Sequence, residues 1–195
     1  VPAATFANFP KKEVYIAKGP VPQPLPSDPA PGSLNAPALT HRYRFLAQKP
    51  QVFPGGTLRL VSEVEFPISS TMTGGLLQIK PGAMRELHWH PNADEWQYYL
   101  RGSARKTVFG SGGRARTEEY VAGDVGYVPQ GFGHYIENIG KDDLELVLAF
   151  NSGIYQSISA TAWFASNPGL LLSTNFGVPE SVFAKFPKDE TTMPE

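Results

Sequence analysis

One short stretch constrains the fold of this chain more than any other, because the spacing of its polar side chains brings them together at one point. Residues 82–102 contain His88 and His90 one residue apart, then a turn composition at 91–94, then Glu95. Side chains on an extended strand alternate between faces, so the two histidines point the same way. The turn reverses the chain, and the next strand presents the glutamate to both imidazoles. This set suits a divalent transition metal, although two exposed strand histidines are the alternative.

A second stretch, residues 123–138, supplies a third histidine after a strand and a turn rich in glycine and proline. Together the stretches read Gly-x5-His-x-His-x4-Glu-x6-Gly and Gly-x5-Pro-x-Gly-x2-His-x3-Asn, with every fixed position present. This pattern resembles the two-part motif of the cupin superfamily. The resemblance implies a small β-barrel that holds a metal ion through His88, His90, Glu95 and His134.

The likeness extends beyond the motif positions. Residues 81–92, 95–99 and 122–129 resemble the C-terminal cupin domain of bacterial and fungal oxalate decarboxylases. That resemblance implies a manganese ion, dioxygen as a cofactor or co-substrate, and conversion of the dicarboxylate oxalate to formate and carbon dioxide. It also assigns Arg85 to substrate binding and catalysis, and Tyr155 to substrate binding. Ligand chemistry alone also admits iron, cobalt, nickel, copper or zinc.

Both assigned residues have structural alternatives. Strict alternation gives Arg85 the parity of Leu87 rather than that of His88, so it reaches the metal only if the strand is irregular. Otherwise Arg85 is a solvated strand arginine. For Tyr155 an aromatic side chain packed before the C-terminal helices is the preferred interpretation over a catalytic role.

The chain departs from the family pattern at its expected proton donor. The family carries a glutamate late in the strand at 144–150, and the corresponding residue here is Leu148. Protonation of the carbon left by decarboxylation needs a general acid, which the sequence does not supply. Three functions therefore stay open. They are an oxalate decarboxylase-like lyase, alone or as the C-terminal half of a two-cupin enzyme, an oxalate oxidase releasing hydrogen peroxide, and a non-catalytic metal-binding or storage cupin.

The remaining pattern predicts an all-β fold, a single cupin barrel of the jelly-roll or double-stranded β-helix type. We expect an N-terminal extension at 1–42 with a Pro-rich strap at 19–32, the barrel at 43–156, and a C-terminal tail with short helices at 157–195. A helix should begin at Pro179. Strands are expected at 11–16, 41–45, 57–66, 74–80, 104–109, 115–120 and 144–150.

The composition of the chain limits the classes of molecule that it can bind. The net charge is −1 with scattered basic residues, which argues against nucleic acid and an anionic membrane surface. No apolar run approaches the roughly 20 residues that span a bilayer. The absence of cysteine excludes disulfides and thiolate ligands. By likeness to its relatives we expect a soluble, secreted protein; if the chain is secreted, its sequence is that of the mature form. We also expect a homo-oligomer or pairing with a second cupin domain.

Overall fold

The computed structural model describes residues 12, 16, 18–21, 40–187 and 191–194. The chain divides into two units, Val1–Ala38 and Leu39–Glu195. The strand expected at 11–16 and most of the strap expected at 19–32 lie outside the described residues.

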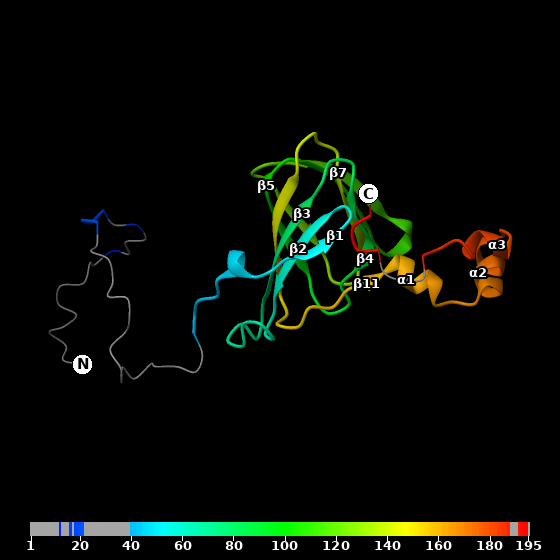
Figure 1. Cartoon of the computed structure of the whole chain (residues 1–195), viewed down its shortest axis with the longest axis horizontal. Coiled ribbons are helices and arrows are strands. Elements are labelled where there is room, and N and C mark those ends of the chain that lie inside the picture. The colour runs from blue at the N-terminus through cyan, green and yellow to red at the C-terminus, as the bar shows by residue number, and fades with distance from the viewer. Residues whose placement is uncertain (1–11, 13–15, 17, 22–39, 188–190, 195) are drawn as a thin grey trace. The chain divides into compact units, whose positions relative to one another are not determined.

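The second unit is a jelly-roll barrel of two antiparallel sheets, which confirms the predicted fold class (Figure 1). Its strands are β1 (Gln51–Phe53), β2 (Gly56–Val61), β3 (Thr73–Ile79), β4 (Met84–Trp89), β5 (Glu95–Arg101), β6 (Ser103–Phe109), β7 (Ala115–Val121), β8 (Val125–Val128), β9 (Gly133–Asn138), β10 (Leu144–Phe150) and β11 (Ile158–Ser159). One sheet has the order β1-β2-β3-β10-β5-β8 and the other β11-β4-β9-β6-β7. Several neighbouring strands, such as β3 and β10 or β4 and β9, therefore come from distant parts of the sequence.

The core lies between the sheets because each strand turns alternate side chains inward. In β10 the inward residues are buried and those between them are half-buried. Apolar burial of this kind is the main force that holds the two sheets together. The buried cluster consists of Leu58, Leu77, Ile79, Ala83, Ala93, Tyr99, Ala104, Ile136, Leu144, Leu146, Leu148, Phe150 and Met193.

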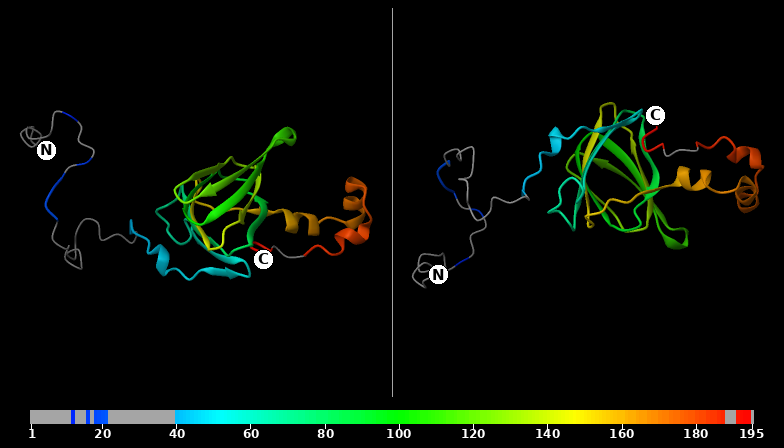
Figure 2. Two further views of the ribbon diagram at one scale, coloured as in Figure 1. Left: turned by 90° about the horizontal axis from the view of Figure 1, so that it is seen from above. Right: turned by 60° about the horizontal axis from the view of Figure 1, so that its bottom comes forward.

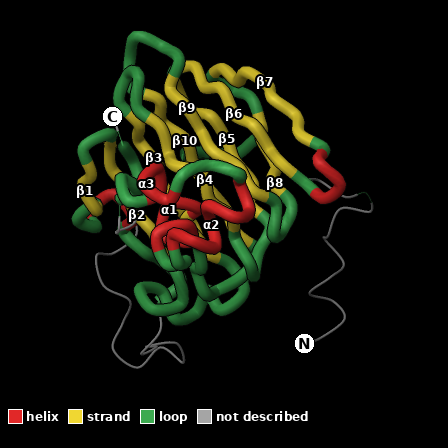
Figure 3. The backbone as a smooth tube through the Cα atoms, turned by 90° about the vertical axis from the view of Figure 1, so that its right-hand side faces the viewer, coloured by secondary structure: helices red, strands yellow, loops and turns green. Residues whose placement is uncertain are grey.

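Three short helices follow the last strand: α1 (Ala160–Ala165), α2 (Gly169–Phe176) and α3 (Glu180–Phe183). They extend away from the barrel in Figures 1 and 2 and lie in front of it in Figure 3. The segment 191–194 then returns to the barrel, where Met193 is fully buried and its carbonyl accepts a hydrogen bond from Gly55 N–H at 3.0 Å. No helix in the described residues is long and apolar enough to cross a membrane.

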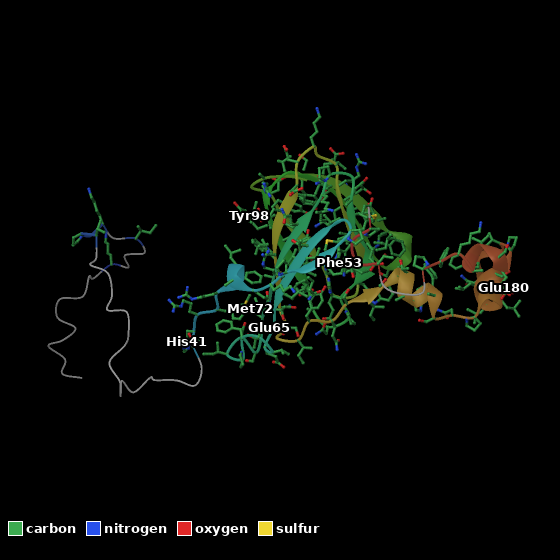
Figure 4. All side chains as sticks on the ribbon, viewed as in Figure 1. His41, Phe53, Glu65, Met72, Tyr98 and Glu180 are labelled. Atoms are coloured by element: carbon green, nitrogen blue, oxygen red, sulfur yellow. The ribbon has the colours of Figure 1, made fainter. Side chains whose placement is uncertain are left out.

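The predicted strands at 74–80, 104–109, 115–120 and 144–150 are confirmed to within a residue. The strand expected at 41–45 is wrong. That segment has no strand and leads into a 3-10 turn, η2 (Phe45–Ala47), with His41 exposed outside the barrel (Figure 4). The strand expected at 57–66 ends at Val61, because Glu65 accepts hydrogen bonds from the N–H and Oγ of Ser62 and forms a turn. Pro179 precedes α3 as its N-cap.

Candidate metal centre and its substrate pocket

Three imidazoles and one carboxylate meet in the barrel interior. His88 lies near the end of β4, His90 directly after that strand, His134 on β9 and Glu95 at the start of β5. The register of β4 and β9 places His88 opposite His134. One candidate ligand atom from each of the four residues lies within 4.8 Å of the others. The two distant stretches of the sequence therefore converge on one point, with contributions from both sheets.

Backbone carbonyls fix the orientation of all three imidazole rings. Each Nδ1 lies within hydrogen-bond distance of a main-chain oxygen. A neutral imidazole has one N–H, so with a metal ion bound at Nε2 these acceptors would hold the proton on Nδ1 and leave the Nε2 lone pair for the ion. The acceptors for His88, His90 and His134 are the carbonyls of Glu86, Gln156 and Phe132, at 2.7, 2.7 and 3.1 Å.

The electrostatics of the cluster favour ligand-competent forms. Glu95 Oε2 lies 2.9 Å from His134 Nε2 and 3.1 Å from His90 Nε2. Burial would raise the pKa of Glu95, but the neighbouring imidazoles, chiefly that of His134, hold it well below its usual value. Burial, aided by the positive charge of Arg85, lowers the pKa of His88 well below 6.5. At neutral pH the site therefore offers a carboxylate and a neutral His88 imidazole.

These groups fit a divalent metal ion. His90 Nε2 is buried and makes no hydrogen bond to any described residue, which is unusual for a buried polar atom unless it binds an ion. Three imidazoles and one carboxylate leave about two of the six positions of an octahedral ion for other ligands. The cavity lined by His88, His90 and Glu95 is small, with a volume of about 10 Å³.

Arg85 lines the same cavity because β4 is irregular. Arg85 and His88 pair with β9 in registers that differ by one residue, so a β-bulge lies between them. The bulge buries both Arg85 and its neighbour Glu86. The Arg85 guanidinium donates hydrogen bonds to the Thr192 carbonyl and to Ser157 Oγ, each at 3.1 Å. The outward direction expected from strict alternation is therefore wrong at this position.

Tyr155 and Leu148 complete the cavity wall. The Tyr155 ring packs against the rings of His90 and Phe150, with centroids 5.5 and 5.2 Å apart. Burial raises the pKa of Tyr155 against the opposing charge of Arg85, so its hydroxyl keeps its proton. Arg85 and Tyr155 also line a neighbouring pocket of about 400 Å³. They therefore separate the enclosed cluster from a larger space.

Several residues that support the cluster were not predicted from the sequence. Glu86 accepts hydrogen bonds from Thr192 N–H and Ser159 Oγ, both at 2.8 Å, and so ties the chain end to β4. Gln97 donates to Glu95 Oε1 at 2.9 Å. Strand parity could have found Gln97, which shares the face of Glu95. Nothing in the sequence marks Thr192, because its role depends on the return of the chain after α3.

Comparison with known proteins agrees with this geometry. The Cupin family model matches residues 43–182. The chain is 44% identical over 163 residues to oxalate decarboxylase OxdC of Bacillus subtilis (strain 168), covering 84% of this chain and 42% of that protein. It is 42% identical over 137 residues to an oxalate decarboxylase of Arthroderma benhamiae, covering 70% and 32%. It is 29% identical over 157 residues to Germin-like protein 1-1 of Oryza sativa subsp. japonica, covering 80% and 62%.

Solved structures give the same family. Oxalate decarboxylase from Bacillus subtilis at pH 4.6 superposes with a TM-score of 0.88 at 38% identity, covering all (100%) of this chain and 51% of that chain. Another structure of that enzyme, which has Mn(II) centers, gives a TM-score of 0.89 at 38% identity and covers 100% and 52%. The chain thus spans about half the length of these relatives. It belongs to the cupin family and is close to the cupin domains of oxalate decarboxylases.

Proposed function

We propose that this chain is a Mn²⁺-dependent, oxalate-degrading cupin that converts oxalate to formate and carbon dioxide, alone or together with a second cupin domain. The observation that carries the proposal is the position of Arg85. A buried guanidinium lines one cavity together with His88, His90 and Glu95, an arrangement that suits a small dianion next to a metal ion. The likeness to oxalate decarboxylases supports manganese and oxalate specifically.

The metal would be held by His88, His90, Glu95 and His134, and it would supply a redox-active Lewis acid with open positions for oxalate and dioxygen. Arg85 binds a substrate carboxylate through paired, charge-assisted hydrogen bonds. The existing cavity of about 10 Å³ is too small for oxalate. Entry therefore requires side chains in the wall shared with the 400 Å³ pocket to move.

Conversion of hydrogen oxalate to formate and carbon dioxide transfers one proton to carbon. Among the described residues that line the cavity, Glu95 is the sole carboxylate, and it belongs to the cluster. Tyr155 is the neutral hydroxyl that remains there. Leu148, in the wall, favours the second candidate function, in which oxalic acid and dioxygen give two molecules of carbon dioxide and one of hydrogen peroxide. A metal-binding or storage protein without turnover is the third.

One assay separates the three functions. The full chain is loaded with MnCl₂ and given oxalate in air, and formate, carbon dioxide and hydrogen peroxide are measured. We expect formate as the main product. Arg85→Met should lower kcat/KM by about 100-fold, because it removes a charged group that binds the reacting carboxylate. Arg116→Met, at a side chain that is 81% exposed, is the matched control and should match the wild type.

Peroxide in place of formate would assign the oxidase reaction. Neither product from a chain that has bound manganese would leave the metal-binding or storage function. An Arg85→Met variant as active as the wild type would remove Arg85 from the substrate site.

A further inference from the structure

A buried lysine lies behind the carboxylate of the metal cluster. Lys106, on β6, is 1% exposed, and its Nζ lies 4.5 Å from the ring centroid of Tyr120. Burial lowers the pKa of Lys106 to about 8, although the charges of Glu95 and Glu118 oppose this shift. A buried ammonium ion costs folding free energy, and an apolar side chain would fill the same space without that cost. Residues that break a local rule in this way are often kept for function.

Lys106 determines how Gln97 is oriented. Gln97 Oε1 accepts hydrogen bonds from Lys106 Nζ and from the Tyr99 hydroxyl, each at 2.9 Å. An ammonium group has donors and no acceptor, so the amide oxygen must face Lys106 and the amide nitrogen must point away from it. The nitrogen donates to Glu95 Oε1 at 2.9 Å. The other carboxylate oxygen, Oε2, then faces His134 Nε2 at 2.9 Å.

The barrel encloses this network tightly. Gln97 and Tyr99 are 0% exposed, so bulk water has no access to replace a lost donor. Gly126, on β8, pairs with Gln97 on β5. A methyl group on Gly126 would lie 2.6 Å from both Gln97 Oε1 and Lys106 Nζ. The absence of a side chain at Gly126 therefore makes room for the contact between the amide and the lysine.

We propose that Lys106 is a positioning residue for the metal centre. It acts through Gln97 to hold Glu95 with one carboxylate oxygen facing the imidazoles. Lys106 and Gln97 do not line the cavity, and neither belongs to the four-residue donor group. The inference rests on the metal site of the proposed function. Gln97 is one hydrogen bond removed from the ligand Glu95 and Lys106 is two; partners one bond removed from a ligand typically change metal affinity about 10–100-fold, so the smaller value is expected for Lys106.

The test measures Mn²⁺ affinity by titration calorimetry on the full chain, together with the melting temperature of the metal-free protein. Lys106→Met should bind Mn²⁺ about tenfold more weakly. It should melt at the wild-type temperature or above, because an uncharged side chain of similar size replaces a buried charge. If Lys106 had only a structural role, Lys106→Met would bind Mn²⁺ as the wild type does and would melt at a lower temperature. The electron paramagnetic resonance spectrum of bound Mn²⁺ should also change, since the carboxylate ligand is held differently.

Gln97→Met and the double variant test the route. Gln97→Met should also weaken binding. If Lys106 acts through Gln97, the Mn²⁺ affinity of the double variant should lie within about twofold of that of Gln97→Met. If the two residues acted independently, the losses of affinity in the single variants would multiply. Gly126→Ala leaves the Lys106 and Gln97 side chains in the sequence but places a methyl group against both of their contacting atoms. It should therefore also weaken Mn²⁺ binding. Lys141→Met, at an exposed lysine, is the matched control and should bind as the wild type does.

The outcomes separate this inference from the proposed function. A wild-type chain that binds no Mn²⁺ overturns both the metal site and the role of Lys106. A wild-type chain that binds Mn²⁺, with Lys106→Met and Gly126→Ala binding equally well, overturns the positioning role alone. Multiplicative losses in the double variant overturn the route through Gln97.

Discussion

Leu148 presents a branched apolar side chain to the cavity from β10 and is only 5% exposed. Its neighbours in that wall include Arg85, His88 and Tyr155. A carboxylic acid at this position would be buried, which raises its pKa, while the positive charge of Arg85 in the same wall would oppose that shift. This one side chain therefore bears directly on whether the reaction has a proton donor.

Leu148→Glu should raise the ratio of formate to hydrogen peroxide, because it adds a general acid beside the substrate. The same change should lower the free energy of unfolding by about 1–3 kcal/mol, since a polar group becomes buried. Product analysis and thermal unfolding measure the two effects. Leu148→Gln, of similar size but without a proton to transfer, is the control. An equal product ratio in both variants would mean that Leu148 does not occupy the acid position.

Among the elements, β4 and the returning segment 191–194 shape the substrate side of the site. The bulge in β4 turns Arg85 inward, where its guanidinium donates a hydrogen bond to a main-chain carbonyl of the returning segment. Met84 N–H donates to the Pro194 carbonyl at 3.3 Å and Glu86 N–H to the Thr192 carbonyl at 3.0 Å. The segment thus continues the sheet beside the bulge, and Met193 anchors it in the core.

Met193→Ala should lower the free energy of unfolding by about 2–5 kcal/mol, because it leaves a cavity in the core. It should also raise KM for oxalate more than it lowers Mn²⁺ affinity, since the segment contacts Arg85 and none of the four ligand side chains. Chemical denaturation, kinetics and calorimetry measure these quantities. Met72→Ala, at a side chain that is 54% exposed, should change stability by about 0.5 kcal/mol or less. If Met193→Ala lowered metal affinity more than substrate affinity, the returning segment would not be specific to the substrate side of the site.

The same elements show what the sequence could predict. Strand β10 was predicted to the residue because strict alternation of leucines has only one interpretation. His88, His90 and Glu95 could be named because their spacing fits two strands and a turn, and His134 could be added because the two-part motif resembles that of cupins. The bulge could not be predicted, since one extra residue in β4 leaves the local pattern unchanged. The returning segment has no periodic pattern, and its docking depends on a surface formed by residues far away in the chain. Lys106 shares strand parity with Ala104, so its inward direction was open to inference.

At the scale of the molecule, the site joins the two sheets, because Glu95 comes from one and His88 and His134 come from the other. A bound ion would therefore stabilise the whole barrel and not one hairpin. The same distribution explains why no short fragment of the chain holds the full donor set.

Saturating Mn²⁺ should raise the melting temperature by about 5 °C or more, and chelation should reverse the increase. Stability should fall as pH drops below about 6.5. The folded state keeps His88 neutral, whereas the unfolded chain takes up the proton, so acid favours unfolding. Protons also compete with the ion for the imidazoles. Thermal unfolding between pH 5 and pH 8, with and without metal, measures both effects. A melting temperature that Mn²⁺ does not change would contradict the metal site.

The enclosure of the cluster has a consequence for how the ion is acquired. Its four donor side chains are each 2–3% exposed, so an ion at their centre could enter or leave only when side chains of the cavity wall move. Exchange would then be slow, and the donor atoms themselves bind several divalent ions, zinc and copper more tightly than manganese. The divalent ions available while the protein folds would therefore decide which metal it first carries.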